Sequence, residues 1–350
     1  MVNIDGKIIG DGEKTFIIAE LSANHANNIE IAKQTIKEVK KAGADAIKLQ
    51  TYTPDTITLD CDNKYFQINQ GTIWDGTTLY KLYEEAYTPW QWHKELFEVA
   101  KQEGLICFST PFDFTAVDFL ETLKVPAYKI ASFEINDIEL IKYVASKGKP
   151  IIISTGIATL SDIELAVKTC IECNNDQIIL LKCTSAYPAP IEEVNLKTIK
   201  NLAETFNVIT GISDHTLGSV VPIGAVAMGA RVVEKHVILD KNLGGPDSRF
   251  SLDINEFKEL VENIRLIEKA IGKVTYELSE KAVKSKEHSR SIFVVDDIKK
   301  GEKLTNKNIK SIRPAFGLEP KYYNEVLGME AICDLKKGTP LSWDLIRKSR

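Results

Sequence analysis

The chain has 350 residues, of which 44% are hydrophobic and 27% are charged, and its formal net charge is −5. This composition is typical of a folded globular protein with enough apolar material for a large core. The acidic balance argues against a nucleic-acid-binding protein, which needs a basic surface, and no apolar run approaches the roughly 18 residues of a membrane span.

Apolar segments that are typical of strands alternate with amphipathic segments along the first part of the chain. We expect strands at residues 16–20, 46–50, 106–110, 127–132, 150–155, 178–183, 208–212 and 231–233, and helices at 29–41, 89–103, 113–123, 161–173, 196–206, 219–228 and 254–271. Strands that alternate with helices form parallel βαβ units, and continuous hydrophobicity is typical of strands buried on both faces. The sequence therefore predicts an α/β fold, a (β/α)₈ TIM barrel, over residues 1–272.

An open, doubly wound sheet is the alternative arrangement of the same elements. Such a sheet normally carries a Gly-rich phosphate-binding turn after its first strand. Here the first strand leads into Leu21-Ser22-Ala23-Asn24-His25, which contains no glycine. The closed barrel is therefore the simpler prediction.

Two polar segments interrupt the barrel pattern at the ends of predicted strands. Residues 51–88 follow the second strand and contain Trp74, and residues 240–247 follow the eighth strand and are rich in Gly and acidic residues. Long loops at the carboxyl-end rim of a barrel more often carry function than short connections do. We therefore expect both segments to be loops that border a site.

The composition and the sequence pattern of the chain change after the last helix that we expect for the barrel. Residues 273–289 are charged and helical without a strand signal, so we interpret them as a linker. Residues 290–350 show short strands and turns, with a weak internal repeat in which Asp297–Glu302 is echoed by Cys333–Pro340. This segment makes a small β domain, which we expect to pack against another part of the protein.

The start of the chain and its six cysteines indicate a reducing compartment. Met1–Gly6 lacks the basic and apolar pattern of a signal peptide, so we expect a cytoplasmic protein whose cysteines are free thiols. Cys170 and Cys173 form a C-x-x-C pair inside a helical pattern, without a second pair elsewhere. We predict no metal or redox site there.

Two histidines follow consecutive predicted strands. His215, in Ser213-Asp214-His215-Thr216, closes the seventh strand, and His236, in Val233-Glu234-Lys235-His236, closes the eighth. From adjacent positions on a barrel rim the two imidazoles could bind one ion, and neutral imidazole suits Zn, Mn, Fe or Co. The alternative is two unrelated histidines, one capping a helix and one buried.

Polar side chains end all eight predicted strands: Glu20, Gln50, Thr110, Ser132 with Glu134, Ser154, Thr184 with Ser185, Ser213 with His215, and Glu234 with His236. The active sites of (β/α)₈ barrels lie at this end, although some of these Ser and Thr residues could be helix N-caps.

Lysines within the predicted strands add a second signal. A buried ammonium is costly unless it is paired with an anion, and Lys48 and Lys129 lie inside strand segments, with Lys182 and Lys235 as further candidates. Each lysine alone could belong to a structural ion pair. Together with the hydroxyls they favour a pocket for a phosphorylated anion. The residues thus indicate a metal-dependent barrel enzyme that acts on a phosphate-bearing substrate.

Specific motifs relate the chain to a known family: Ile18–His25, Ala42–Tyr52, Trp74–Tyr80, Phe108–Asp113, Tyr128–Glu134, Ser154–Gly156, Cys183–Pro188 and Gly211–Thr216. With these motifs the chain resembles the sialic acid synthase family over nearly its whole length. The Leu21-Ser22-Ala23 form of the first motif and the segment around Trp74 resemble the branch that makes pseudaminic acid.

The resemblance implies a barrel followed by a small antifreeze-like β domain, called a SAF domain, in a domain-swapped homodimer. It also implies condensation of phosphoenolpyruvate with an N-acylated amino-deoxyhexose and release of phosphate by C–O cleavage. For the pseudaminic branch the sugar is 2,4-diacetamido-2,4,6-trideoxy-L-altrose. A divalent ion is implied as cofactor, usually Mn²⁺, with Mg²⁺ or Co²⁺ as alternatives. Nucleic-acid and membrane partners are not implied.

By position, the resemblance also implies roles for individual residues. The metal ligands are His215 and His236. Phosphoenolpyruvate is held by Lys48, Thr110, Lys129, Ser132, Ser154, Ser185 and Ser213, where Ser185 replaces the Asn of several sialic acid synthases. The sugar faces Glu20, Gln50, Tyr187 and Asp247, and Arg313 reaches its acyl group from the partner's β domain. Glu134 and Glu234 manage protons near the metal, and either Glu20 or Glu134 could be the base.

Two other functions remain open at this point. One is a synthase of the same chemistry that makes legionaminic or N-acetylneuraminic acid. The other is a non-catalytic carbohydrate-binding protein with the terminal β domain as its binding element. That domain is rich in Lys and Glu and lacks the flat Thr arrays of ice-binding surfaces.

Overall fold

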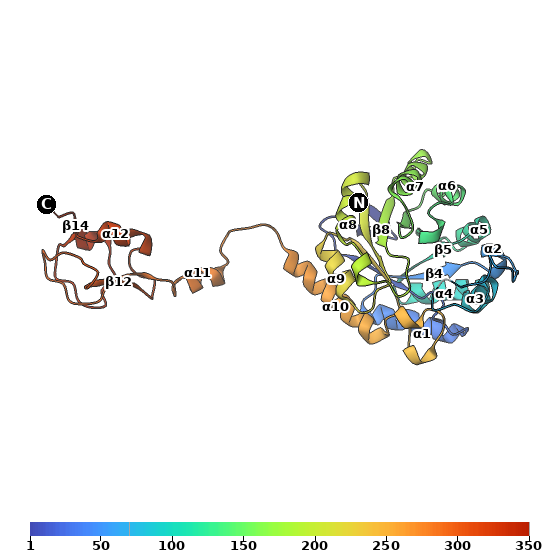
Figure 1. Ribbon diagram of the computed structural model, residues 1–350, viewed down its shortest axis with the longest axis horizontal. Helices are drawn as coiled ribbons and strands as arrows, with labels where there is room; N and C mark the ends of the chain where they lie inside the picture. Colours follow the sequence, from blue (N-terminus) through green and yellow to red (C-terminus); the bar gives the residue numbers. More distant parts are fainter. Residues whose placement is uncertain (70, 350) are drawn as a thin grey trace. The chain divides into compact units, whose positions relative to one another are not determined.

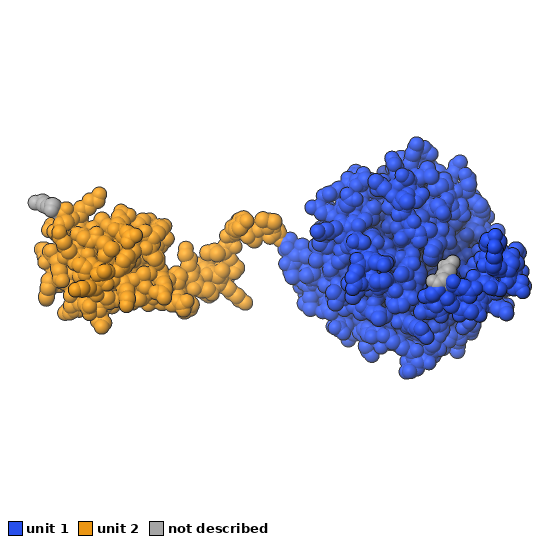
Figure 2. Space-filling model, viewed as in Figure 1, with its two compact units in different colours: residues 1–272 blue, residues 273–350 orange. Residues whose placement is uncertain are grey.

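The computed structural model describes residues 1–69 and 71–349 (Figure 1). The chain divides into two compact units, Met1–Gly272 and Lys273–Arg350 (Figure 2). Among the described residues, no helix is long and apolar enough to cross a membrane. The six cysteines are free thiols.

Within the described part of the first unit, eight parallel strands close into a barrel in the order β10-β3-β4-β5-β6-β7-β8-β9. Their bounds are β3 Phe16–Glu20, β4 Ala46–Thr51, β5 Ile106–Pro111, β6 Tyr128–Ile130, β7 Ile151–Ser154, β8 Ile178–Cys183, β9 Ile209–Asp214 and β10 Val232–His236. Closure occurs where β10 pairs with β3, from Val232 with Phe16 to His236 with Glu20. The predicted barrel is confirmed, and the open-sheet alternative is wrong.

Helices surround the barrel (Figure 1): α1 Ile29–Ala42, α4 Trp90–Gln102, α5 Phe114–Thr122, α6 Ile138–Ala145, α7 Leu160–Glu172, α8 Lys197–Phe206, α9 Val220–Ala227 and α10 Ile254–Ile271. Their ends follow from local chemistry. Asn28 accepts a hydrogen bond at the start of α1, and Asp253 forms a capping box with Glu256 at the start of α10. Gly43 ends α1 in the left-handed conformation, at φ +99°.

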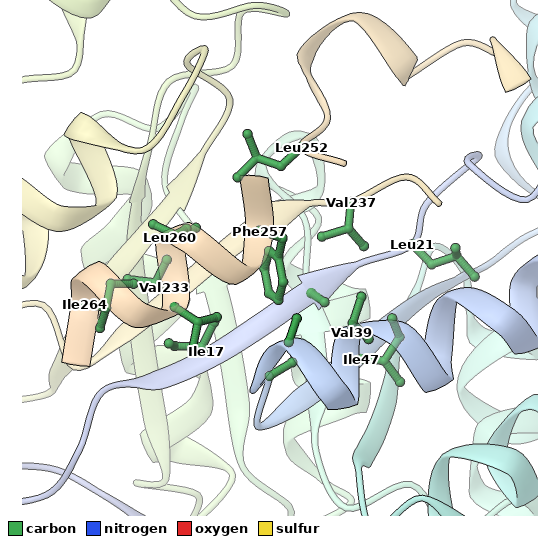
Figure 3. Packing of buried hydrophobic residues seen from close by; sticks show 14 of the residues in the cluster. Ile17, Leu21, Val39, Ile47, Val233, Val237, Leu252, Phe257, Leu260 and Ile264 are labelled. Carbon is green, nitrogen blue, oxygen red and sulfur yellow. The ribbon is translucent and has the colours of Figure 1, made fainter. Parts of the chain in front are cut away.

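The largest apolar cluster lies between the strands and their outer helices. Phe257 and Leu260 of α10 pack beside Val233 of β10 and Ile17 of β3 (Figure 3). These four side chains are essentially buried. This packing stabilises the seam where β10 meets β3, because burial of apolar side chains is the main favourable contribution to folding.

A two-stranded hairpin, β1 Val2–Ile4 and β2 Lys7–Ile9, was missed by sequence analysis because its strands have only three residues each. Ile4 and Ile9 are fully buried and belong to the cluster that fills the barrel interior together with Phe16 and Phe108. The amino-terminal end of the barrel is therefore filled by apolar groups. The polar residues that end the strands lie at the opposite end.

The segment after β4 differs from the prediction of an irregular loop. It contains two short helices, α2 Pro54–Ile57 and α3 Leu79–Ala86, between which the chain forms turns. The capping hydroxyls of Thr53 and Thr78 mark the start of these helices. The polar composition that suggested a loop is thus that of two short, partly buried helices.

The second unit has small sheets and its own core. Its elements are α11 Glu280–Lys286, β11 Ser291–Val294, β12 Ile309–Ile312, α12 Tyr323–Val326, β13 Glu330–Ala331 and β14 Ile346–Arg347. Buried apolar side chains such as Ile292, Leu304 and Leu341 form the core.

The internal repeat of the second unit corresponds to two turns that face each other. Lys299 is ion-paired with Asp334 at 3.0 Å, and Lys336 with Asp297 at 2.8 Å. The backbones of Ile298 and Leu335 exchange two hydrogen bonds of 2.8 Å. The repeated sequence therefore encodes a reciprocal contact.

Candidate active site

The barrel places most of the predicted site residues at the carboxyl ends of its strands: Glu20 on β3, Lys48 and Gln50 on β4, Thr110 on β5, Lys129 on β6, Ser154 on β7, Ser213 on β9, and Glu234 and His236 on β10. Others lie in the following loops: Ser132 and Glu134 after β6, Ser185 and Tyr187 after β8, His215 after β9, and Asp247 after β10. Because the strands are parallel, all of these ends meet on one face.

Lys48 lies in a buried group of charges. Its ammonium is ion-paired with Glu20, lies 3.7 Å from Glu234 Oε1, and donates a hydrogen bond of 3.2 Å to Thr110 Oγ1. Burial opposes the charge on Lys48, but the two carboxylates outweigh it and hold the pKa of the ammonium above its usual value. Burial raises the pKa of Glu20 to about 7, although Lys48 favours its charged form. Lys48 is therefore a cation beside a carboxyl that can gain a proton near neutrality.

Lys129 is a second buried ammonium. It donates a hydrogen bond of 2.7 Å to Ser154 Oγ and lies 3.9 Å from Glu234 Oε1. The same Glu234 oxygen accepts a 3.0 Å bond from Ser213. Burial would raise the pKa of Glu234, but Lys129 and Lys48 outweigh burial and hold it below its usual value. Glu234 is therefore a carboxylate between two cations.

Hydroxyl groups from two loops surround Gly156, which follows β7. Its N–H donates a 2.5 Å bond to Ser132 Oγ. A Cβ atom added at Gly156 would lie 2.1 Å from Ser185 Oγ and 2.5 Å from Ser132 Oγ. Gly156 therefore leaves the space in which the two hydroxyls lie. Sequence analysis included this glycine in a motif but assigned it no role.

The two imidazoles lie side by side. The ring centroids of His215 and His236 are 5.2 Å apart, and Phe250 packs against both rings. His215 Nδ1 lies 3.1 Å from the carbonyl oxygen of Thr184, which can only accept, so Nδ1 carries the proton and Nε2 a free lone pair. His236 Nδ1 is buried without a hydrogen-bond partner among the described residues. Burial, reinforced by His215, lowers the pKa of His236, so its ring is neutral.

These features fit a bound metal ion. A ring N–H held by a backbone carbonyl is the usual support of a metal-ligating histidine, and an orphaned buried nitrogen indicates a missing ligand. Among the described residues, no group of three or more His, Cys, Asp or Glu side chains could hold a metal ion. The described residues thus offer two adjacent imidazoles as ligands for such an ion.

Asp247 and Tyr187 border the imidazoles. Asp247 Oδ2 lies 3.8 Å from His236 Nδ1 and accepts a 2.5 Å bond from Ser22 Oγ. The ring of Tyr187 lies 4.4 Å from the ring of His215. Sequence analysis missed Ser22 and Phe250 as site residues, although Ser22 belongs to a motif that it singled out.

Glu134 and Arg313 complete the set of predicted site residues. Glu134 follows β6, its Oε2 is buried without a hydrogen-bond partner among the described residues, and burial raises its pKa to about 7 despite Lys129. Arg313 belongs to the second unit, where it directly follows β12.

The sequence also offers Lys182 and Lys235 as candidates for the anion pocket. Lys235 is ion-paired with Asp214 at 2.6 Å and donates to the carbonyl oxygen of Thr216. Lys182 donates a 2.5 Å bond to the carbonyl oxygen of Cys183. Lys235 therefore belongs to a structural ion pair, whereas Lys182 lines a small cavity with Ser213 and His215 and stays a candidate for the pocket.

Comparisons with known proteins identify the relatives of this chain. The NeuB family model matches residues 35–276, and the SAF domain model matches residues 289–347. The chain is 51% identical to the pseudaminic acid synthase of Campylobacter jejuni serotype O:23/36 over 94% of its length and 96% of the relative. It is 49% identical to the pseudaminic acid synthase of Helicobacter pylori, over 95% and 98% respectively.

Solved structures agree with this relationship. The structure of N-acetylneuraminic acid synthetase from Leptospira borgpetersenii, in complex with citrate, matches with a TM-score of 0.73 and 31% identity. The match covers 81% of this chain and 94% of that one.

Proposed function

Because the chain belongs to the NeuB family, we propose that it joins phosphoenolpyruvate to an N-acylated amino sugar and releases phosphate. One observation carries this proposal. Two buried ammonium groups, Lys48 and Lys129, and two adjacent imidazoles lie on the same face of the barrel. The ammonium groups suit the anionic substrate, and the imidazoles suit a metal.

We propose pseudaminic acid as the product. Two relatives that are about half identical over nearly the whole chain are pseudaminic acid synthases, which supports this choice over legionaminic or N-acetylneuraminic acid. The second substrate is then 2,4-diacetamido-2,4,6-trideoxy-L-altrose.

Phosphoenolpyruvate would bind over the ammonium groups, with its phosphate and carboxylate near Lys48 and Lys129. The surrounding hydroxyls would complete the site: Thr110, Ser132, Ser154, Ser185 and Ser213. Such charge-assisted bonds are about twice as strong as neutral ones and fix the reactant in place. Ser185 lies with Ser132 beside Gly156, which supports its inclusion despite the Asn found in several relatives.

His215 and His236 would hold the divalent ion, for which we propose Mn²⁺. When bound, the ion supplies Lewis-acid polarisation of the sugar aldehyde. The protein's own contribution is to keep the His236 ring neutral by burial and to aim His215 through its bond to the Thr184 carbonyl.

The reaction forms a C–C bond and a C–O bond to water, and it breaks the C–O bond to phosphate. C3 of phosphoenolpyruvate bonds to the aldehyde carbon, and the aldehyde oxygen takes a proton. Water then adds to the cationic C2 and loses one proton; when the C–O bond to phosphate breaks, the remaining hydroxyl loses its proton and becomes the ketone oxygen. Glu20 and Glu134, whose pKa values burial raises to about 7, suit these proton transfers because a general acid or base works best near the ambient pH.

The sugar would lie between the rim loops. Gln50, Tyr187 and Asp247 are the proposed contacts from the barrel. We further propose that the protein is a homodimer in which Arg313 of the partner subunit contacts the acyl group of the sugar.

An assay of phosphate release with three candidate sugars tests this function. With phosphoenolpyruvate and Mn²⁺ we expect the altrose derivative to be turned over much faster than 2,4-diacetamido-2,4,6-trideoxymannose or N-acetylmannosamine. Faster turnover of either of the other two sugars would show that pseudaminic acid is not the main product. Sugar binding that withstands a chelator and gives no phosphate with any sugar would instead indicate a carbohydrate-binding protein.

We predict that Gly156→Ala lowers kcat/KM for phosphoenolpyruvate by about 10- to 100-fold, or roughly 1.4–2.7 kcal/mol of transition-state stabilisation. The new methyl group would displace the hydroxyls of Ser132 and Ser185. Steady-state kinetics of phosphate release measure the effect. Gly224→Ala is the matched control, because its methyl group meets only Leu196 Cδ1, at 3.0 Å, on the outer helices. Equal kinetics for the two variants would refute the role of Gly156.

A further inference from the structure

Trp74 lies in a turn whose backbone is held by hydrogen bonds to the side chain of its neighbour Asp75. The side chain of Asp75 accepts hydrogen bonds of 2.8 Å from Gly71 N and 2.9 Å from Thr72 N. The same carboxylate accepts a 2.8 Å bond from Thr72 Oγ1. These bonds fix the backbone next to Trp74. The indole therefore extends from an ordered turn between α2 and α3.

The indole of Trp74 joins three loops at the rim of the barrel. Its Nε1 donates a 3.0 Å hydrogen bond to the carbonyl oxygen of Pro246, in the loop after β10. Its ring lies 5.5 Å from the ring of Tyr187, in the loop after β8. Trp74 itself comes from the segment after β4. One half-buried side chain therefore connects segments that are far apart in the sequence.

The hydrogen bond from Trp74 holds Pro246, the residue directly before Asp247, which is a proposed sugar contact. Asp247 is already held on two other sides, by Ser22 Oγ on its carboxylate and by Ser251 Oγ, which donates a 2.7 Å bond to its carbonyl oxygen. Trp74 adds a further attachment to this loop, and Asp247 lies beside His236. Gly244 and Gly245, which precede Pro246, have positive φ, +67° and +108°, a conformation that glycine adopts without steric cost.

We propose that Trp74 is a positioning residue for the sugar site, which acts through Pro246 to hold Asp247 at the rim. This inference rests on the function proposed above. The indole contacts Tyr187 and Pro246, two residues on the sugar side of the proposed site, whereas the ammonium groups of the phosphoenolpyruvate site are on β4 and β6. Loss of Trp74 should therefore weaken binding of the sugar and leave binding of phosphoenolpyruvate unchanged.

Hydrogen–deuterium exchange tests the attachment without any substrate. Trp74→Phe keeps an aromatic ring and removes only the N–H donor. We expect faster exchange in peptides that cover residues 241–252. Trp90→Phe is the matched control, because Trp90 Nε1 also donates a 3.0 Å bond to a backbone carbonyl, that of Tyr52, and its ring also has an aromatic neighbour, Phe119. It should leave exchange over 241–252 as in the wild type.

Kinetics then test the consequence for the sugar. We expect Trp74→Phe to raise the KM of the sugar by roughly 3- to 10-fold, the ratio that one neutral hydrogen bond corresponds to. Trp74→Leu, which also loses the ring contact, should raise it further. The KM of phosphoenolpyruvate should stay within about twofold of the wild-type value. A role in stability alone would lower the active fraction, and hence the apparent kcat, without this split.

Three outcomes separate the possibilities. Unchanged exchange over 241–252 in Trp74→Phe would overturn the attachment itself. Faster exchange with an unchanged KM for the sugar, or with parallel rises in both KM values, would overturn the positioning role. Absence of phosphate release by the wild-type protein would defeat the proposed function and with it the role at a sugar site, and the exchange result would still decide the attachment.

Discussion

His236→Ala and His215→Ala are each expected to reduce phosphate release at least about 10³-fold, or roughly 4 kcal/mol in activation free energy. Each variant removes one of the two ring nitrogens that would bind the ion. With one imidazole left, the site would lose the ion and the polarisation of the aldehyde. Both side chains lie at the open end of the barrel and not in its apolar core, so the fold should persist.

Metal content provides a readout that is independent of turnover. After incubation with Mn²⁺ and gel filtration, we expect about one ion per chain in the wild-type protein and much less in either variant. His288→Ala is the matched control, because His288 is exposed in the second unit. Wild-type turnover or undiminished Mn²⁺ in both imidazole variants would show that these rings do not hold the ion.

Lys235→Met is expected to lower the free energy of unfolding by about 3–5 kcal/mol. The ammonium of Lys235 is fully buried, and its removal would leave the equally buried Asp214 carboxylate without its counter-ion. The Thr216 carbonyl would lose a donor as well. Lys235 and Asp214 are register partners on β10 and β9, so the pair connects the two strands that carry the imidazoles.

Denaturant unfolding followed by circular dichroism measures this effect. The double variant Asp214→Asn with Lys235→Met removes both charges, and we expect it to recover part of the loss, because the cost comes from the unpaired carboxylate. Lys200→Met is the control, since its pair with Glu204 at 3.6 Å is exposed on α8 and should contribute less than about 1 kcal/mol. A loss below about 1 kcal/mol in Lys235→Met would contradict the proposed cost of the unpaired charge.

Local pattern was enough to predict the barrel and the polar rim. A segment such as β8, Ile178–Cys183, is apolar on both faces, and a strand of this kind must be covered by helices on one side and by other strands' side chains on the other. Parallel strands all end on the same face, so Glu20 and His236 could be placed near each other from their positions at strand ends alone.

The same continuous hydrophobicity could not tell the inner face of a strand from the outer. Lys129 and Lys235 both interrupt apolar strands, but one bonds Ser154 near the carboxylates and the other pairs with Asp214. Side chains alternate between faces along a strand, so a shift of one residue exchanges them. Only the register of the closed barrel decides which lysine belongs to the site.

The sequence by itself determined the eight barrel strands, the helices between them and the polar residues at the strand ends, because these depend on neighbours in the chain. The tertiary structure alone decided the contacts that complete the rim. Trp74 and Pro246 are 172 residues apart, and Ser22 and Asp247 are 225 residues apart. The physical reason is that the barrel closes through the pairing of β10 with β3, and this closure brings the rim loops together. A local sequence pattern contains no information on which distant loops will meet.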